Sequence, residues 1–438
     1  MGSVSQTDLK IKIKSTSLVH PPIEVERRSM FLSNIDQFLN VDMGTVHFFS
    51  SNQAFPPSDV CEAVVRALRE LLVPYDFLAG RLKEDPLTGR FEIDCNGAGA
   101  GFVVASTERA LEDMGDLTCP SPDIVKLVPS KSLPGLEDWP LMVIQVTSFA
   151  CGGFAMGISN NHITFDGISF KMFLDNLASL AAGGPLSVEP LNDRHLFSFR
   201  SPPSENIPNP DPVTLDEDIQ TKGAAASTEN IQTKLFHLTH SDIAALKDKA
   251  NAAASAPTHS SFNVLTAHIW RCKSLSAADG TDPNSTLGVN YAVDVRPRLP
   301  LPASYTGNGI FISICSATYG ELAEGTLSWV AELVREGAEI VTGEYVRSVV
   351  ELLEGVPGHH GLAVLGGGLL VTSWWRLGLE GVEYPWGKVL CYMDTGGLGN
   401  DVAVLLLDFR GSGGVNVLVS LRGDEMERFE KLFYDLLK

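Results

Sequence analysis

The residues best suited to chemistry lie in one short segment, Ser159–Gly167, which reads Ser-Asn-Asn-His-Ile-Thr-Phe-Asp-Gly. His162 follows an apolar stretch, and Asp166 comes four residues later, directly before a helix-like segment. An imidazole is the side chain best matched to proton transfer near neutral pH. Asp166 could orient that imidazole, or it could cap the following helix. The segment therefore predicts a general base, and the H-x-x-x-D spacing by itself leaves a purely structural interpretation open.

Other familiar catalytic patterns are missing from the sequence or incomplete. No intact G-x-G-x-x-G, P-loop, G-x-S-x-G or H-E-x-x-H pattern occurs. The pair His359-His360 has no carboxylate or thiolate at a ligand-like spacing, which favours ordinary loop histidines over a metal site. We therefore expect no metal and no permanently bound cofactor.

Composition excludes several classes of function. The 438 residues include 33 Lys and Arg against 53 Asp and Glu, for a net charge of -20. Such an acidic chain lacks the basic surface that nucleic acids and anionic membranes require. The 7 cysteines are far apart and never form C-x-x-C, which indicates reduced thiols and a cytoplasmic location. The longest apolar run, Gly361–Val371, is too short to span a bilayer, so we expect no membrane span.

Strand-like and helix-like segments alternate around His162 and would position it. Two apolar stretches, Leu141–Phe149 and Gly153–Asn160, flank a Cys-Gly-Gly turn and predict a hairpin that ends just before His162. Amphipathic spacing predicts helices over Pro57–Leu72 and Gly167–Ala181. A general base at this strand-to-helix junction would lie in a cleft.

The second half of the chain repeats this mixture after a change in composition. Residues 183–222 are rich in proline and too long for an ordinary connection, so they predict a crossover linker. The further expected elements are helices over Ser241–Ala253, residues 260–273 and Asp424–Leu437, one long or two shorter helices over Leu322–Leu353, a strand over Leu287–Val295, and a hairpin of Val402–Leu407 with Gly414–Leu421. The alternation predicts an α/β protein of two domains with mixed sheets, residues 1–182 and 223–438.

Several short motifs stand in a fixed order along the chain. Besides His162 to Asp166, they are Leu32-Ser-Asn-Ile-Asp36, Leu78-Ala-Gly80-Arg81-Leu82, Tyr291-Ala-Val-Asp294-Val-Arg296, Tyr305-Thr-Gly-Asn308-Gly309, Thr372-Ser-Trp374 and Tyr384-Pro-Trp386-Gly387. In this order and spacing, the chain resembles the plant BAHD acyl-CoA-dependent acyltransferases over essentially its whole length. The resemblance implies two domains like chloramphenicol acetyltransferase, joined by a long crossover loop. It further implies that a segment near residues 365–385 packs on the first domain, and we expect a monomer.

The resemblance also implies an active-site channel between the domains and roles for individual residues. Coenzyme A thioester would enter from one side and the acyl acceptor from the other. His162 would remove the proton of the acceptor hydroxyl, or amine, as that group attacks the thioester carbonyl. Asp166 would pair with Arg296 and be structural. Thr372 and Trp374 would line the reacting centre, where the oxyanion forms.

Contacts with coenzyme A are expected from the second half of the chain. Ser260 and Ser261 match a stretch that contacts coenzyme A in the family, and hydroxyls at a helix start suit its phosphates. Lys247 would add a local positive charge, although it could equally be a solvated surface side chain. The resemblance thus implies acyl-CoA as a co-substrate.

One departure from the family concerns its second signature, D-F-G-W-G. The matching stretch here is Glu383-Tyr384-Pro385-Trp386-Gly387. Glu383, Trp386 and Gly387 would keep the structural role of that signature, which lies away from the reacting atoms. Pro385 restricts the backbone where the family has a flexible glycine.

A second departure concerns the acceptor. Shikimate and quinate transferases of this family hold the acceptor carboxylate with an Arg, and His359 takes that place here. Between Arg347 and Arg376 the chain has no Arg or Lys. Because histidine cannot replace a bidentate guanidinium equally, we expect a neutral or long-chain alcohol as the acceptor.

Two hypotheses follow. The first is an acyltransferase that moves a hydroxycinnamoyl or other aromatic or aliphatic acyl group from coenzyme A to a hydroxyl, with amide formation still open. The Leu32–Asp36 neighbourhood resembles the branch that acts on ω-hydroxy acids and fatty alcohols. The alternative is a non-catalytic member that acts as a partner in lipid elongation, and the departure at Glu383–Pro385 motivates it.

Overall fold

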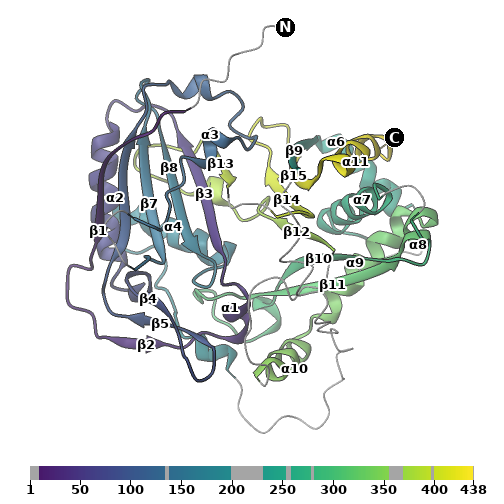
Figure 1. Ribbon diagram of the computed structural model, residues 1–438, viewed down its shortest axis with the longest axis horizontal. Helices are drawn as coiled ribbons and strands as arrows, with labels where there is room; N and C mark the ends of the chain where they lie inside the picture. The colour runs from purple at the N-terminus through teal and green to yellow at the C-terminus, as the bar shows by residue number, and fades with distance from the viewer. Residues whose placement is uncertain are drawn as a thin grey trace.

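The computed structural model describes residues 9–133, 138–198, 230–252, 258–277, 281–354, 368–395 and 399–437. Two six-stranded sheets stand side by side, with helices packed against each of them (Figure 1). None of the helices in these ranges is both long enough and apolar enough to cross a bilayer. The prediction of an α/β fold with two mixed sheets is confirmed.

The first sheet is built mostly from the N-terminal half. Its strands, in spatial order, are β1 (Lys12–Val19), β6 (Ala100–Ser106), β7 (Met142–Ser148), β8 (Phe154–Asn161), β3 (Asp42–Phe49) and β13 (Cys391–Asp394). Only β6 and β7 are parallel, and the other neighbours are antiparallel. Helices α2 (Pro57–Leu71) and α4 (Gly167–Ala181) bury their apolar faces in the same core as this sheet, which excludes water from it.

The second sheet is built from the C-terminal half. Its strands, in spatial order, are β11 (Ile310–Thr318), β10 (Thr286–Asp294), β12 (Leu369–Ser373), β14 (Val402–Leu407), β15 (Val415–Arg422) and β9 (Ile231–Leu238). The parallel pairs are β10 with β12 and β12 with β14. Its helices are α6 (His240–Ala250), α7 (Ser261–Leu275), α9 (Leu327–Ile340) and α11 (Gly423–Asp435).

Smaller elements complete the fold. A three-stranded sheet contains β2 (Arg28–Met30), β5 (Phe91–Cys95) and β4 (Arg81–Glu84). The remaining α-helices are α1 (Asn34–Phe38), α3 (Pro122–Val125), α8 (Tyr319–Glu324) and α10 (Gly343–Glu354). Short 3₁₀ turns are η1 (Asp76–Ala79), η2 (Leu111–Met114), η3 (Arg194–Phe197), η4 (Arg296–Arg298) and η6 (Leu379–Gly381).

One segment of the C-terminal half, here called the exchanged segment, packs on the first half and overlaps the range near 365–385 that was expected to do so. β12 belongs to the second sheet, and the chain crosses to the first half only from Trp374 onward. It then adds β13 beside β3, with Cys391 opposite Phe48. The crossing occurs because the apolar side chains that follow β12 are buried in the core of the first half. They are Leu379, Val382, Tyr384, Trp386, Val389 and Tyr392.

Two other predicted ranges also differ from the structure. Leu322–Leu353 was expected to hold one or two helices, but it contains parts of three, α8, α9 and α10. A new helix, α9, starts at Leu327 because the hydroxyl of Thr326 accepts a hydrogen bond from the Trp329 amide and caps it. The predicted linker, residues 183–222, lies outside the described residues from 199 onward. Its described part is packed, since Leu191 bridges to Tyr305.

Candidate active site

His162 directly follows β8, where the first half of the molecule meets the second. Its backbone amide donates to Val41 O at 2.8 Å, which anchors the turn. The half-buried ring places Nδ1 3.1 Å from Asn308 Oδ1. Among the described residues, Nε2 has no hydrogen-bond partner. The ring therefore offers one free nitrogen for proton transfer.

The electrostatic surroundings keep this imidazole neutral. Burial lowers the pKa of His162 below its ordinary value, while a backbone hydrogen bond, Asp166, Asn308 and Asp36 raise that pKa in partial opposition. Because the lowered pKa favours the unprotonated ring at neutral pH, the free nitrogen can accept a proton.

Asp166 is occupied by structural contacts. Its carboxylate caps α4 by accepting from Ser169 N at 3.0 Å. It also forms an ion pair with Arg296 at 2.8 Å and accepts from Gly309 N at 2.8 Å. The ion pair with Arg296 implied by the resemblance is thus present. These contacts use both carboxylate oxygens and join α4 to the loop before β11.

The glycines of the Tyr305–Gly309 segment are required by close packing. A Cβ on Gly309 would lie 2.6 Å from the guanidinium carbon of Arg296. A Cβ on Gly307 would overlap the hydroxyl of Tyr305. Only glycine allows the backbone to come this near to both side chains.

Asn308 is a site residue that the sequence reasoning did not assign. It was noticed only as part of the Tyr305–Gly309 motif. Its side chain is fully buried and lies between His162 and Asp36, with Nδ2 2.7 Å from Asp36 Oδ1. In the sequence, Asn308 stands between two glycines in a motif that accompanies His162. This pattern suggests that Asn308 belongs to the site, but it does not show which residues Asn308 contacts.

Thr372 and Trp374 lie at the seam between the halves. Thr372 is half-buried on β12, and Trp374 follows this strand, with its amide donating to Leu405 O at 2.8 Å. The Trp374 ring packs against the core of the first half and also against Val404, Leu406 and Leu418. None of the hydrogen bonds among the described residues connects Thr372 or Trp374 to His162.

The Glu383–Gly387 stretch lies in the first half, in contact with the faces of β3 and β8. The Tyr384 and Trp386 rings stack at 5.1 Å, and Phe49 meets both edge-on. Gly387 turns the chain with φ +125. Glu383 is exposed, and within the described ranges it forms no ion pair. The stretch is an aromatic packing unit that joins the exchanged segment to the first sheet.

The residues expected to contact coenzyme A lie in the second half. Ser260 caps α7, with Asn263 N donating to its hydroxyl at 3.1 Å. Ser261 is the first residue of α7, and Lys247 lies in the last turn of α6. In the part of the chain that the structure describes, no hydrogen bond or ion pair joins these side chains to His162. The α7 start nevertheless presents hydroxyls and amide groups of the kind that bind phosphate.

Metal-site and acceptor candidates are only partly covered by the structure. His359 and His360 lie outside the described residues. Within the described ranges, no group of three or more His, Cys, Asp or Glu side chains is placed to hold a metal ion.

The chain is similar in sequence and in fold to known proteins. A profile of the Transferase family matches residues 9–436. Acyltransferase GLAUCE of Arabidopsis thaliana is 46% identical over 98% of this chain and 97% of its own length. Hydroxycinnamoyltransferase 2 of Oryza sativa subsp. japonica is 33% identical over 98% of this chain and 100% of its own. The crystal structure of TRI101 from F. sporotrichioides, complexed with coenzyme A and T-2, is similar in fold, with a TM-score of 0.75, 17% identity, and coverage of 92% of this chain and 97% of TRI101.

Proposed function

Because this chain belongs to the Transferase family, the BAHD acyltransferases that its motifs resemble, we propose that it transfers an acyl group from coenzyme A to a hydroxyl, with His162 as the general base. One observation carries the assignment of the base. The His162 ring has a lowered pKa that favours its neutral form and is held through Nδ1, and among the described residues its Nε2 has no hydrogen-bond partner.

The reaction would proceed without a covalent enzyme intermediate. His162 Nε2 takes the proton of the acceptor hydroxyl while the hydroxyl oxygen forms a bond to the thioester carbonyl carbon. The carbonyl π electrons move to the oxygen and form a tetrahedral oxyanion, for which Thr372 and Trp374 are the proposed neighbours. The oxyanion then collapses, the carbon–sulfur bond breaks, and His162 returns the proton to the coenzyme A thiolate.

The proposed donor is a hydroxycinnamoyl or other aromatic or aliphatic acyl-CoA. A relative at 33% identity is named a hydroxycinnamoyltransferase, and TRI101 was crystallised with coenzyme A. Ser260 and Ser261 at the start of α7, with Lys247 nearby in sequence, are the proposed phosphate contacts. The net charge of -20 makes such a local site necessary, because coenzyme A is itself an anion.

The proposed acceptor is a neutral or long-chain alcohol. The absence of Arg and Lys between Arg347 and Arg376 supports this, since an anionic acceptor would need a cationic clamp. The same base would serve an amine, so amide formation is tested in the same screen. We also propose a monomer in the cytoplasm, supported for the location by seven cysteines that are all free thiols.

Activity of the purified protein toward a matrix of acyl-CoA donors and alcohol or amine acceptors tests this function. For the best pair, His162→Ala should lower kcat roughly 10²–10⁴-fold, the usual share of general acid–base catalysis. His240→Ala is the matched control, because His240 is exposed at the start of α6. Equal turnover of His162→Ala and the wild type would contradict the assigned base. Rescue of a null plant by His162→Ala would instead support the non-catalytic alternative.

A further inference from the structure

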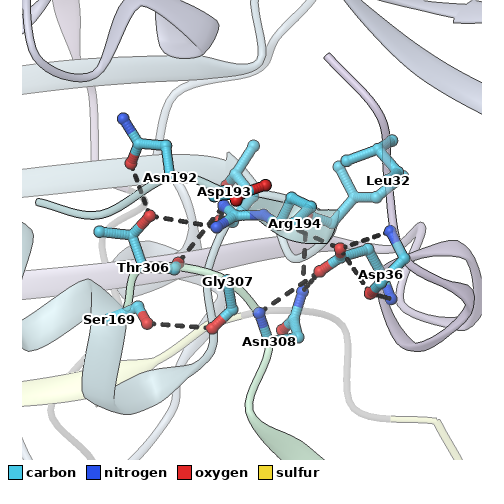
Figure 2. A network of polar contacts seen from close by, with 12 residues as sticks. Leu32, Asp36, Ser169, Asn192, Asp193, Arg194, Thr306, Gly307 and Asn308 are labelled. Carbon is cyan, nitrogen blue, oxygen red and sulfur yellow. Dashed lines mark hydrogen bonds and ion pairs between the residues drawn. The ribbon is translucent and has the colours of Figure 1, made fainter. Parts of the chain in front are cut away.

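A buried polar network lies behind the candidate base and joins three distant parts of the chain (Figure 2). Asp36 comes from α1, Arg194 from η3 in the crossover region, and Asn308 from the loop before β11. Their exposed fractions are 0%, 2% and 0%. In Figure 2, Asn308 points toward Asp36, and Arg194 reaches between Asp36 and Thr306. Buried charge is costly unless it is well paired, so this placement requires an explanation.

The orientation of the Asn308 amide is decided by its surroundings. One end of the amide lies 2.7 Å from Asp36 Oδ1, 3.0 Å from His162 O and 3.4 Å from Ile163 O. All three of these atoms can only accept hydrogen bonds, so this end must be the NH₂ group. The other end, Oδ1, then faces His162 Nδ1 at 3.1 Å.

This orientation determines where the ring proton sits. An amide oxygen can only accept, so the neutral ring must carry its hydrogen on Nδ1. Nε2 then holds the lone pair that accepts a proton. A reversed amide would present NH₂ to Nδ1 and favour the opposite tautomer, in which Nε2 is protonated and cannot act as a base.

We propose that Asp36 is a positioning residue, which holds the Asn308 amide in one orientation and so keeps the lone pair of His162 on Nε2. This inference rests on the proposed general-base function. Asp36 is the charged member of the three acceptors, and a charged acceptor binds an N–H more strongly than a carbonyl does. It also accepts from the backbone amide of Asn308 at 3.3 Å, which places the whole residue.

Asp36 is itself held rigidly. Its second oxygen accepts from Ser33 N at 2.9 Å and from Ser33 Oγ at 2.7 Å, in the capping box of α1. Arg194 Nε lies 3.8 Å from the same oxygen. The guanidinium carbon of Arg194 lies over the rings of Phe77 and Tyr305, 5.5 and 5.4 Å from their centroids. Residues from three segments of the chain thus fix the position of the Asn308 amide, which in turn contacts the His162 ring.

Two carboxylates influence the His162 ring, and they allow a matched test. Asp36 lies opposite Arg194, and Asp166 lies opposite Arg296. Both carboxylates raise the pKa of His162, so removing either charge should lower it. Of these two carboxylates, Asp36 alone accepts a hydrogen bond from Asn308 Nδ2 among the described residues. Asp36→Asn and Asp166→Asn therefore each remove one negative charge, but only Asp36→Asn is expected to change the tautomer of the His162 ring.

The test is ¹⁵N NMR of the histidine rings in the full-length protein, with His162 assigned from His162→Gln. In the wild type and in Asp166→Asn, the ring should be the Nδ1–H tautomer. In Asp36→Asn, the Nε2–H tautomer should become populated, and kcat should fall on the order of tenfold with the KM for acyl-CoA little changed. An Asp36→Asn ring that stays in the Nδ1–H form would overturn the proposal.

A second variant keeps the proposal testable if Asp36→Asn does not fold. Asn308→Ser removes both ends of the amide, and the same loss of the Nδ1–H tautomer is expected. A retained Nδ1–H ring in this variant would equally count against the proposal. Because the NMR readout needs no substrate, it remains decisive even if no acyl-transfer activity is found, and that result would count against the proposed function alone.

Discussion

The two carboxylates near His162, Asp166 and Asp36, have similar contacts but differ in how they are connected to the imidazole. Asp166 caps α4, and Asp36 completes the capping box of α1, in which Ser33 is the cap. Each carboxylate faces an arginine, and each accepts a backbone amide from the Asn308–Gly309 pair. The carboxylate oxygens of Asp166 bind Arg296, Gly309 and the start of α4. Asp36 also accepts a hydrogen bond from the Asn308 amide, which faces the His162 ring. The carboxylate nearer in sequence is therefore the anchor, and the distant one is the proposed orienting group. Spacing along the chain did not reveal this difference.

The largest expected effect comes from removing Arg296. Arg296→Met would leave the Asp166 carboxylate, only 1% exposed, without its 2.8 Å partner. Breaking a buried pair in this way should cost about 3–5 kcal/mol in the free energy of unfolding, measured by urea titration.

Lys171→Met is the control for the Arg296 prediction, because Lys171 and Asp175 form a half-exposed pair on the same helix, α4. Its loss should cost about 0–1 kcal/mol. Similar costs for the two variants would show that the Asp166 pair is not an anchor.

A smaller loss of stability is expected from Gly309→Ala. The new Cβ would lie 2.6 Å from the Arg296 guanidinium and push it from Asp166, at a cost of about 1–3 kcal/mol. Gly381→Ala is the matched substitution in open space, since no atom lies within 4 Å of its Cβ position. Thermal melting of both variants checks this, and an unchanged Gly309→Ala protein would refute the close-packing argument.

Two other buried histidines provide a comparison for His162 on acidification. Burial lowers the pKa of His47, in the first sheet, and of His268, on α7, to about 4 each. A histidine with a lowered folded-state pKa stabilises the fold above its unfolded pKa of about 6.5, and this contribution is lost as the pH falls toward the folded value. Each should contribute on the order of 1 kcal/mol less to the free energy of unfolding at pH 5 than at pH 7.

Urea titrations of His47→Phe and His268→Phe at these two pH values test the acid prediction. Each variant should be less sensitive to acid than the wild type. A pH dependence identical to that of the wild type would show that these rings are not buried in the neutral form.

The last expected effect concerns the pH profile of activity, in Asn308→Asp, a variant that also loses stability because one carboxyl oxygen would face the three acceptors that now bind the NH₂ group. A carboxylate facing Nδ1 stabilises the imidazolium, so the pKa of His162 should rise. The acidic limb of the kcat/KM profile should then move to higher pH, opposite to its movement in Asp36→Asn. A limb that moves in the same direction in both variants would contradict the assigned contacts.

Much of the fold was predictable because its signals are local. The helix over Pro57–Leu71 follows from apolar residues on one face, and the hairpin of β7 and β8 follows from two apolar runs around a glycine turn. β11 was missed because its apolar residues do not follow its alternating burial: Ser313 is buried, whereas Ile314 is exposed. β13 was missed because it has only 4 residues and its identity as a strand comes from pairing with β3.

The candidate site was predictable to a similar extent. His162, Asp166 and Arg296 stand in motifs whose order was recognisable, and the ion pair between Asp166 and Arg296 is present. The exact bounds of the exchanged segment were not predictable, because the burial of its aromatic side chains depends on a core built by the other half. Asn308 had no assigned role, since neither of its partners lies near it in sequence.

The sequence by itself determined the kinds of groups available. An imidazole follows an apolar strand, and the helix caps and glycines that local backbone geometry requires are present. Residues 348–375 contain no Lys or Arg. Only the tertiary structure decided which polar atoms surround that imidazole. Hydrogen bonds depend on distances of about 3 Å between atoms, and Asp36, His162 and Asn308 reach such distances only after both sheets and the crossover segment have packed. For that reason the proposed general base could be named from the chain, but the groups that orient it could be found only in the fold.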